Sequence, residues 1–426
     1  MAMDRRRVVV TGAGCLSCLA DSPAGLHAAL CAGESGLKPI ELFPTEGIGC
    51  HQGGEIRPFD AQGYLPDRNL RPIDRTSRLL LVAAGQALAA SGLSDAATQR
   101  TEREVGLVLG TTFCSVRTIA EFDRRNLQLG PSYASPFDFA NSVINAAAGQ
   151  TAIWYGLRGL NSTISAGASS GLAAVGYAVD QIRGGRAAAL LAGGAEELCF
   201  ESFFGHYQAG RLCGSASGRG DGGEFPIPFD ARRNGFALAE GAALVTLEDA
   251  EVAAGRGAPV LAEVLGHGSG FDPLGTEASA VRAVARAVRL ALDDANLAAS
   301  GLDAWSAGAN GSVDGDRWET LGVAAALGAR AAELPVTAVK SMLGEALGAS
   351  GGLQVVSLLG TLGDGVLPGI PGLESADADF PFPPAAAAAR RLPVHHALIT
   401  SLSADGHAWA LILGATGATG AAGEDA

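Results

Sequence analysis

The sequence lacks the features that would place a protein in a membrane or outside the cell. No stretch of 18 or more uncharged apolar residues occurs, so we expect no membrane span. Residues 1–7 run directly into an apolar strand, without the apolar stretch and cleavage site of a signal peptide. The seven cysteines are scattered and are expected to be reduced thiols. We therefore predict a cytoplasmic protein.

Basic clusters and ligand motifs are also missing. The net charge is −14, and no run of Lys and Arg interleaved with aromatic residues occurs, so we expect no nucleic-acid partner. Cys15 and Cys18 form a lone C-x-x-C pair with no second pair or His cluster, which favours packing over a metal site. Gly12 and Gly14 follow an apolar run, but Ser17 stands where a dinucleotide motif needs its third glycine. We therefore predict neither a metal nor a cofactor.

What the sequence does contain fits a densely packed α/β protein. Of its 426 residues, 48% are hydrophobic and 60 are glycine, a composition that lets helices and strands pack closely. Apolar runs typical of buried strands alternate with helical patterns in both halves of the chain. Strands are expected at 7–14, ending in a glycine turn, and at 104–110, 187–194, 242–248, 260–266, 336–340, 397–400 and 408–413. Helices are expected at 74–90, 142–155, 278–295 and 347–359.

Several separated motifs carry more specific information. They are Gly156–Gly159, the run Asn161–Gly171 that leads into Leu191–Glu197, Pro228–Ala242, and Lys340–Gly344 followed by Leu347–Gly351. In this order they closely resemble the motifs of β-ketoacyl-acyl-carrier-protein synthases (ketosynthases), and the resemblance covers about residues 7–414. It implies the thiolase fold, in which two similar halves form a five-layer α-β-α-β-α core. It also implies that the protein is an obligate dimer. We expect these halves at 1–252 and 253–414, followed by a disordered tail at 415–426.

The resemblance also implies a catalytic Cys and two catalytic His, and all three are absent. Ala168 stands at the position of the Cys, and a methyl group cannot attack a thioester. Gly308 falls at the first His and Glu345 at the second, where a carboxylate has the wrong charge to stabilise an oxyanion. Lys340 matches a retained family position, and we expect a buried cation that is paired with Glu345.

An intact frame without its catalytic residues is most similar to a chain-length factor, the non-catalytic partner of a type II polyketide ketosynthase. The resemblance implies a heterodimer with an active ketosynthase that extends acyl chains bound to an acyl carrier protein and sets their length. The acyl carrier protein is expected to reach the complex through the partner. Arg68 and Arg71 match positions that help to dock the carrier in active relatives, although Pro72 breaks the basic pattern there.

Other functions remain open. A repurposed acyl hydrolase or acyltransferase would use Ser169, or Ser170, as its nucleophile, with Glu345 or Asp314 as the base. His is the usual base, and none of the seven His lies at a matched site position. An engineered Cys-to-Ala variant of an active synthase would have kept both His. A scaffold that binds acyl carriers without shaping a product is the remaining alternative.

The family's chain-length residues suggest where the acyl pocket lies. They match the segment 110–122, in which Phe113 follows a buried strand, and Val116, Ile119 and Phe122 follow at helical spacing. We expect these four side chains to line the pocket near the dimer interface. The interface itself is expected within 142–190, where Ile144, Ala147, Ala152 and Tyr155 would otherwise expose a large apolar patch.

Overall fold

Ten strands form one mixed sheet in the computed structural model, which describes residues 5–65, 69–94, 105–215, 223–273, 275–377 and 386–416. The order across the sheet is β10-β9-β13-β14-β8-β1-β7-β6-β4-β5. These strands are β1 (Val8–Ser17), β4 (Gly106–Gly110), β5 (Asn161–Ile164), β6 (Ala189–Glu196), β7 (Gly241–Asp249), β8 (Ala262–Phe271), β9 (Ala304–Ser306), β10 (Val336–Thr337), β13 (His396–Leu402) and β14 (His407–Ala415).

The two halves of this sheet repeat one arrangement. In the N-terminal half, β1–β7 and β7–β6 are antiparallel, and β6–β4 and β4–β5 are parallel. In the C-terminal half, β8–β14 and β14–β13 are antiparallel, and β13–β9 and β9–β10 are parallel. A short antiparallel ladder joins the halves, from the Val8–Val264 pair to the Val10–Ala262 pair. The two half-sheets of the expected fold are therefore continuous in hydrogen bonding as well as similar in topology.

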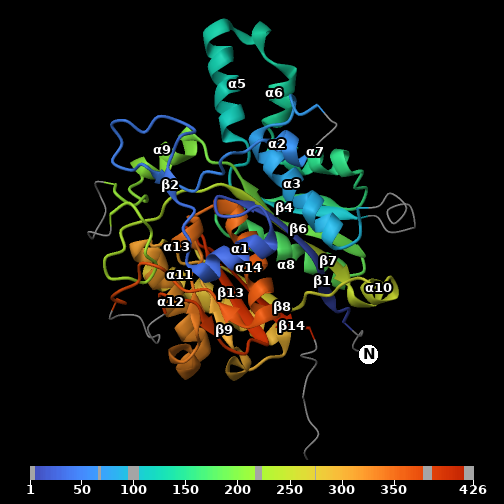
Figure 1. Ribbon diagram of the computed structural model, residues 1–426, viewed down its shortest axis with the longest axis vertical. Coiled ribbons are helices and arrows are strands. Elements are labelled where there is room, and N and C mark those ends of the chain that lie inside the picture. Colours follow the sequence, from blue (N-terminus) through green and yellow to red (C-terminus); the bar gives the residue numbers. More distant parts are fainter. Residues whose placement is uncertain are drawn as a thin grey trace, which may run out of the picture.

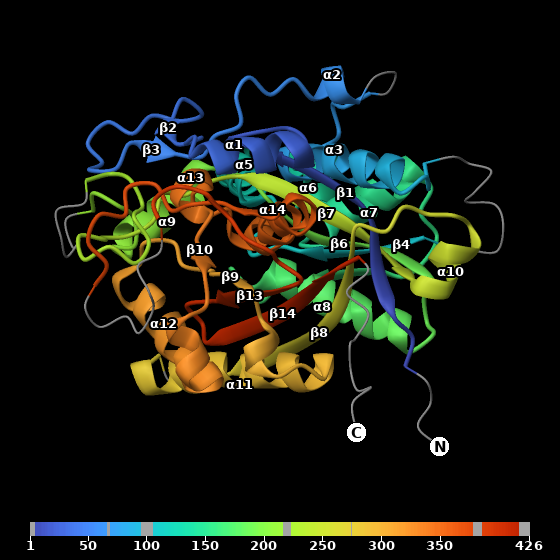
Figure 2. The ribbon, with the colours of Figure 1, turned by 60° about the horizontal axis from the view of Figure 1, so that its bottom comes forward.

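Helices cover both faces of each half-sheet. The helices of the described residues are α1 (Pro23–Ala32), α2 (Ala61–Tyr64), α3 (Arg75–Ala90), α5 (Val116–Leu129), α6 (Pro136–Asn141), α7 (Ala146–Tyr155), α8 (Ser170–Arg183), α9 (Phe200–Gln208), α10 (Ala250–Gly255), α11 (Glu277–Ala295), α12 (Val313–Leu327), α13 (Lys340–Leu343) and α14 (Ser350–Asp364). Two small sheets pair β2 (Lys38–Pro39) with β3 (Gln52–Gly53) and β11 (Val366–Leu367) with β12 (Arg390–Arg391). Figure 2 shows the layers, with α1 and α3 on one side, α8 and α14 between the half-sheets, and α11 and α12 on the other side.

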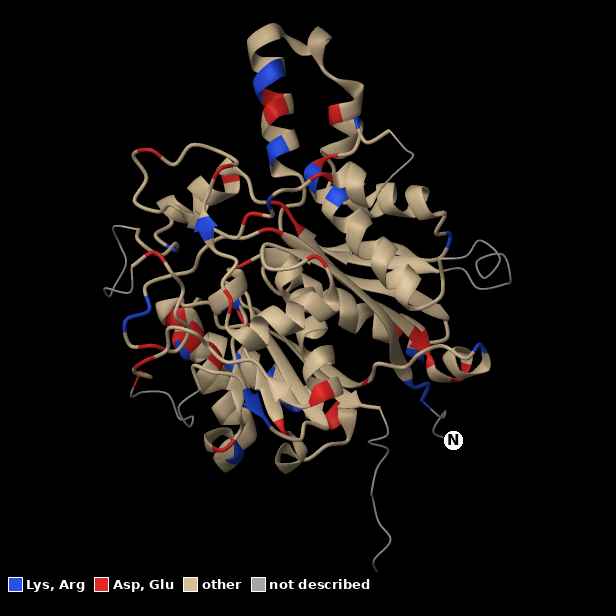
Figure 3. Ribbon diagram, in the orientation of Figure 1, with Lys and Arg blue, Asp and Glu red and all other residues tan. Residues whose placement is uncertain are grey.

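The sequence explains which helices lie inside and which outside. Helix α14 is rich in small and apolar residues and is buried throughout its first nine positions, as a helix between two sheets must be. Helix α11 has one buried Ala- and Val-rich face. It begins at a capping box formed by Thr276 and Ser279 and ends at Asn296, whose backbone is left-handed. The charged residues lie mainly on outer helices and loops, and the central strands are almost free of them (Figure 3).

The glycines in the first strand serve packing, whereas the sequence prediction of a turn at these positions was wrong. We expected Gly12 and Gly14 to form a turn at the end of the strand, but β1 continues through both to Ser17. A Cβ atom at Gly12 would lie 2.5 Å from the carbonyl oxygen of Ala87, and one at Gly14 would lie 2.1 Å from that of Ala83. The absence of side chains therefore lets α3 pack directly against the strand.

Helices α5 and α6 project from the body of the molecule (Figure 1). We call residues 116–141, which contain α5, a short 3-10 turn at Pro131–Tyr133 and α6, the arm. None of the residues of α5 is buried. Several large apolar side chains of the arm are exposed, namely Leu127, Leu129, Tyr133, Phe137 and Phe139. Residues 126–137 carry no charge, and the outer end of the arm is uncoloured in Figure 3.

At the C-terminus, β14 extends to Ala415, which pairs with Ala262, so the sheet reaches the first residue of the expected tail. Residues 417–426 lie outside the described part of the chain. Among the described residues, no helix combines the length and the hydropathy that crossing a membrane would require.

Candidate functional site

A cavity of about 860 Å³ opens between the two halves of the chain. The N-terminal half contributes Thr112, Phe113, Ala168 and His206 to its lining, among others, and the C-terminal half contributes Gly308, Asn310, Glu345 and Ser403. The structure therefore brings together the three positions that the sequence comparison had marked as degenerate, Ala168, Gly308 and Glu345.

Ala168 lies in the turn between β5 and α8, at the position that the family resemblance assigns to the catalytic Cys. Its backbone N–H donates to Ser403 Oγ at 3.2 Å, and Ser401 Oγ donates to its carbonyl at 3.3 Å. Ser170 Oγ closes the turn by donating to the Gly167 carbonyl at 2.6 Å. The turn is thus held in place by backbone and hydroxyl contacts, while the one side chain that would need to react is a methyl group.

Gly308 follows β9 and has little room for any side chain. Its N–H donates to Glu319 Oε1 at 2.9 Å. A Cβ atom here would lie 2.9 Å from the Thr400 carbonyl oxygen and 3.0 Å from Ser401 Cα, both of which are backbone atoms. Burial raises the pKa of Glu319 to about 7, against the opposing effect of hydrogen bonds from Thr400 and Gly308. The space at this position therefore fits glycine, and a histidine side chain would displace the neighbouring backbone.

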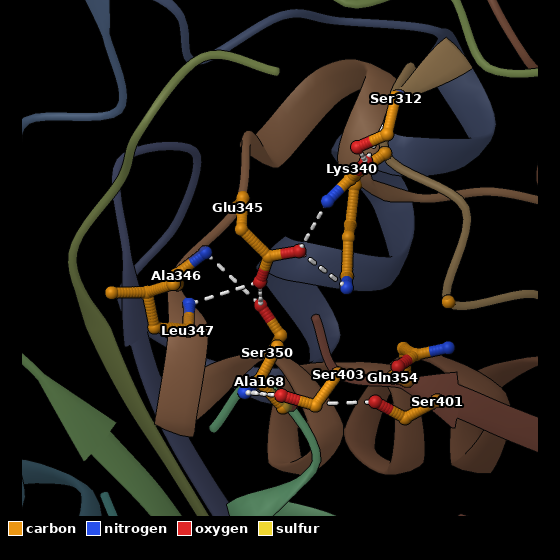
Figure 4. Close-up of polar contacts among 12 residues, drawn as sticks. Ala168, Ser312, Lys340, Glu345, Ala346, Leu347, Ser350, Gln354, Ser401 and Ser403 are labelled. Atoms are coloured by element: carbon orange, nitrogen blue, oxygen red, sulfur yellow. Dashed lines mark hydrogen bonds and ion pairs between the residues drawn. The ribbon is translucent and has the colours of Figure 1, made fainter. Parts of the chain in front are cut away.

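The Glu345 carboxylate accepts hydrogen bonds on both of its oxygen atoms (Figure 4). Its Oε2 atom accepts hydrogen bonds from Lys340 Nζ at 2.7 Å and from Asn310 Nδ2 at 2.8 Å. Its Oε1 atom accepts from the Leu347 N–H at 3.0 Å and from Ser350 Oγ at 2.6 Å. Glu345 and Lys340 are 1% and 3% exposed. The expected pair is present, and a charged buried carboxylate has donors on both of its oxygens.

A second buried carboxylate, Glu196, shapes the cavity wall and was not recognised in the sequence. It ends β6 and accepts the N–H groups of Thr112, Phe113 and Cys114 at 2.6, 2.9 and 3.0 Å, as well as that of Gly348 at 3.2 Å. Burial raises its pKa to about 7, although these hydrogen bonds oppose the rise. Only its place at the end of a buried strand could have indicated this role, since its partners are distant in the sequence.

The candidate serine nucleophile has no base beside it. Ser169 is fully buried, and its hydroxyl contacts Ser401 Oγ and the His407 carbonyl, each at 3.2 Å. Of the two proposed bases, Glu345 is bonded as described above, and Asp314 lines the cavity and is exposed in the first turn of α12. Within the described residues, the contacts of Ser169 include neither a carboxylate nor an imidazole, so the hydrolase hypothesis gains no geometric support.

The residues expected to form the acyl pocket separate into two groups. Phe113 lines the cavity, with its ring centroid 6.4 Å from that of His206. Val116, Ile119 and Phe122 lie on the arm and are not among the described residues that line this cavity. His206, which matched no motif, does line it, and burial lowers its pKa to about 4, so its ring is neutral.

The residues considered for carrier docking are only partly covered by the structure. Arg68 lies outside the described residues. Arg71 is described and exposed, and its N–H donates to Asn69 Oδ1 at 3.0 Å. Its side chain is thus available at the surface, but the proposed docking role stays a prediction.

Known proteins share both the sequence pattern and the fold. Residues 5–253 match the N-terminal domain model of the β-ketoacyl synthases, and residues 261–374 match the C-terminal domain model. The 3-oxoacyl-[acyl-carrier-protein] synthase 2 of Synechocystis sp. is 29% identical over 95% of this chain and 97% of its own. The solved structure of the ishigamide ketosynthase/chain length factor is 30% identical, with a TM-score of 0.89, over 97% of this chain and 100% of that one.

A second solved structure, a type II PKS acyl-carrier protein in complex with its ketosynthase bound to the hexaketide, is 26% identical with a TM-score of 0.86. It covers 97% of this chain and 100% of its own. The fold is therefore that of the thiolase-like ketosynthases, as expected. Together with the domain matches, this establishes that the chain belongs to the β-ketoacyl synthase family.

Proposed function

We propose that this chain is a non-catalytic, chain-length-factor-like subunit that pairs with an active ketosynthase and limits the length of the acyl chain. One observation carries the proposal: Ala168, Gly308 and Glu345 face a single cavity in a frame that is otherwise intact. The cavity has room for a ligand, but at these positions it offers neither a nucleophile nor an imidazole for an oxyanion. Binding without condensation is the function that such a cavity supports.

The arm supports the need for a partner chain. Leu127 and Phe137 are 87% and 70% exposed, and both belong to the uncharged part of the arm. Apolar surface of this extent marks an interaction site in a folded protein. Ile153 on α7, outside the arm, is also 78% exposed. The ishigamide structure, in which a ketosynthase and a chain length factor are named together, suggests the kind of partner.

The expected interface patch on 142–190 needs one correction. Ile144 is exposed, as predicted, but Ala147 is completely buried in the core next to α3. Tyr155 is half-buried, and its hydroxyl donates to the Leu81 carbonyl at 2.7 Å. Helix α7 begins at Ala146 and turns these two side chains inward, so the exposed position on its other face is Ile153.

The proposal is tested by co-expression with a ketosynthase that has an intact Cys and both His. Size exclusion and native mass spectrometry should show a heterodimer. Leu127→Asp with Phe137→Asp should release the monomer, because two charges would be buried in the interface. Leu290→Asp is the matched control, since Leu290 is 40% exposed on α11, far from the arm in Figure 1.

Three results would contradict the proposal. A wild-type chain that stays monomeric at micromolar concentration when co-expressed with the ketosynthase would show that the apolar arm needs no partner. A homodimer that persists in the presence of the ketosynthase would replace the heterodimer. Condensing activity of the purified chain alone would show that the cavity is catalytic after all.

A further inference from the structure

Two of the donors around Glu345 are held in place by residues other than Glu345. The Asn310 amide is oriented by Ser312, whose N–H and hydroxyl both donate to Asn310 Oδ1, at 3.0 and 2.5 Å. Ser350 Oγ accepts the Ala346 N–H at 3.0 Å. Asn310 Nδ2 is then directed at one oxygen of the Glu345 carboxylate and the Ser350 hydroxyl at the other. Figure 4 shows Ser350 beside Glu345.

The third side-chain donor is a buried cation. Lys340 Nζ lies 2.7 Å from Glu345 Oε2, and both side chains are almost completely shielded from water. The described residues that line the cavity include Glu345 and Asn310 but not Lys340. Glu345 therefore stands between the cavity and the ammonium group. Two neutral donors, one backbone N–H and one ammonium group around a single carboxylate form a carboxylate-binding site.

We propose that Glu345 is an internal carboxylate that fills this site and thereby bars ligands with a terminal carboxylate from the cavity. The outer part of a Glu side chain is a CH₂–COO⁻ group, and the same group ends a malonyl thioester. A malonyl ligand could not displace Glu345, which is attached to the chain, and its carboxylate would meet the negative charge of this buried side chain. The malonyl part of this inference rests on the proposed function, whereas the carboxylate site itself does not.

The site is tested on the purified full-length chain by chemical rescue. Truncation by Glu345→Ala removes a CH₂–COO⁻ group, which has the size of acetate, and leaves the buried Lys340 without its counter-ion. We expect acetate, compared with acetamide in sodium chloride of equal ionic strength, to raise the Tm of this variant by roughly 3 °C or more near saturation. The wild-type chain should show no difference between the two solutes.

The control for the cation is the double variant Lys340→Met with Glu345→Ala, which keeps the space but removes the charge. It should be insensitive to acetate. An equal response to acetate and acetamide, an equal response in the double variant, or no response in Glu345→Ala would each overturn the site. If Glu345→Ala does not fold in chloride, its refolding yield from urea is compared in acetate and in acetamide. Recovery in acetate alone supports the site, and recovery in neither overturns it.

The exclusion of malonyl groups has its own measurement. Malonyl-N-acetylcysteamine and its uncharged methyl ester are titrated into the wild-type chain and into Glu345→Ala by calorimetry. We expect the charged thioester to bind Glu345→Ala at least about fivefold more tightly than the ester does, and to lose this advantage in the wild-type chain. A wild-type chain that binds the charged thioester as tightly as the variant does would overturn the exclusion. Neither result depends on whether a heterodimer forms.

Discussion

Shortening Phe113 to alanine should lengthen the product of the assembled complex. Phe113 lies in the turn between β4 and α5 and lines the cavity. Its backbone N–H is held by Glu196 at 2.9 Å, so the substitution should leave the turn in place and remove only the ring. The space vacated by the ring would admit about one further two-carbon unit of the acyl chain.

The structure also indicates that the variant will remain folded. The Phe113 side chain is not core, since the residue is 45% exposed. Complete burial of a Phe contributes about 1.5–3 kcal/mol, so the loss of a ring that is about half buried should cost roughly 1–2 kcal/mol. This is well below the roughly 3–5 kcal/mol expected for truncating a fully buried Phe. A change in product length can thus be separated from a loss of folded protein.

The assay is product profiling of the heterodimer by mass spectrometry, with a melting curve for each variant. Phe200→Ala is the matched control, because Phe200 is 39% exposed on α9 and does not belong to the described cavity lining. It should cost similar stability without altering the product. An unchanged product from a well-folded Phe113→Ala complex, or the same lengthening in the control, would refute the assignment of Phe113 to the pocket.

Three further outcomes follow from the structure. Introducing Ala168→Cys, Gly308→His and Glu345→His together should not produce condensing activity, because a Cβ at Gly308 meets backbone atoms at 2.9–3.0 Å. Turnover of malonyl and acyl thioesters at a rate near that of the partner ketosynthase would contradict this. Intact-mass spectrometry after incubation with acyl thioesters should show no adduct, and a stable adduct on Ser169 would favour the hydrolase. Burial raises the pKa of Glu197 to about 8 in the folded chain, whereas the unfolded chain releases this proton near pH 4.5. The free energy of unfolding of the wild-type chain should therefore fall as pH rises from about 4.5 to 8. Urea melts of Glu197→Gln should show less decline over this window, and an identical decline would refute the assignment.

The degenerate centre could be located from the sequence because family motifs fix the register of each position. Ala168 and Glu345 are separated from recognisable residues by only one or a few positions, so no three-dimensional information was needed to find them. The sequence could not predict why position 308 has no room for a side chain, because the backbone atoms that restrict it belong to Thr400 and Ser401, about ninety residues away. The donors of Glu345 were only partly visible, since Asn310 and Ser350 approach it from different elements.

The arm shows a different limit of sequence reasoning. The spacing of Val116, Ile119 and Phe122 correctly predicted a helix, and the structure places α5 over Val116–Leu129. An apolar stripe indicates that one face of a helix needs a partner, but it does not indicate which chain supplies that partner. In the single chain, the stripe is not packed into the core. Its proposed place beside the acyl pocket therefore stays a prediction for the assembled complex.

The contacts around Glu345 also indicate how a centre of this kind can lose its chemistry and keep its fold. A buried charge whose partner is removed destabilises a protein by roughly 3–5 kcal/mol, whereas a well-packed apolar pair in its place can be neutral. With Lys340 retained and only 3% exposed, a carboxylate at 345 supplies the missing counter-charge, which a neutral imidazole would not. Under the proposed function, Glu345 is then a stabilising replacement as well as an inactivating one. The same donors fix Glu345 in place, so we expect that changing this residue alone would not create a condensing site.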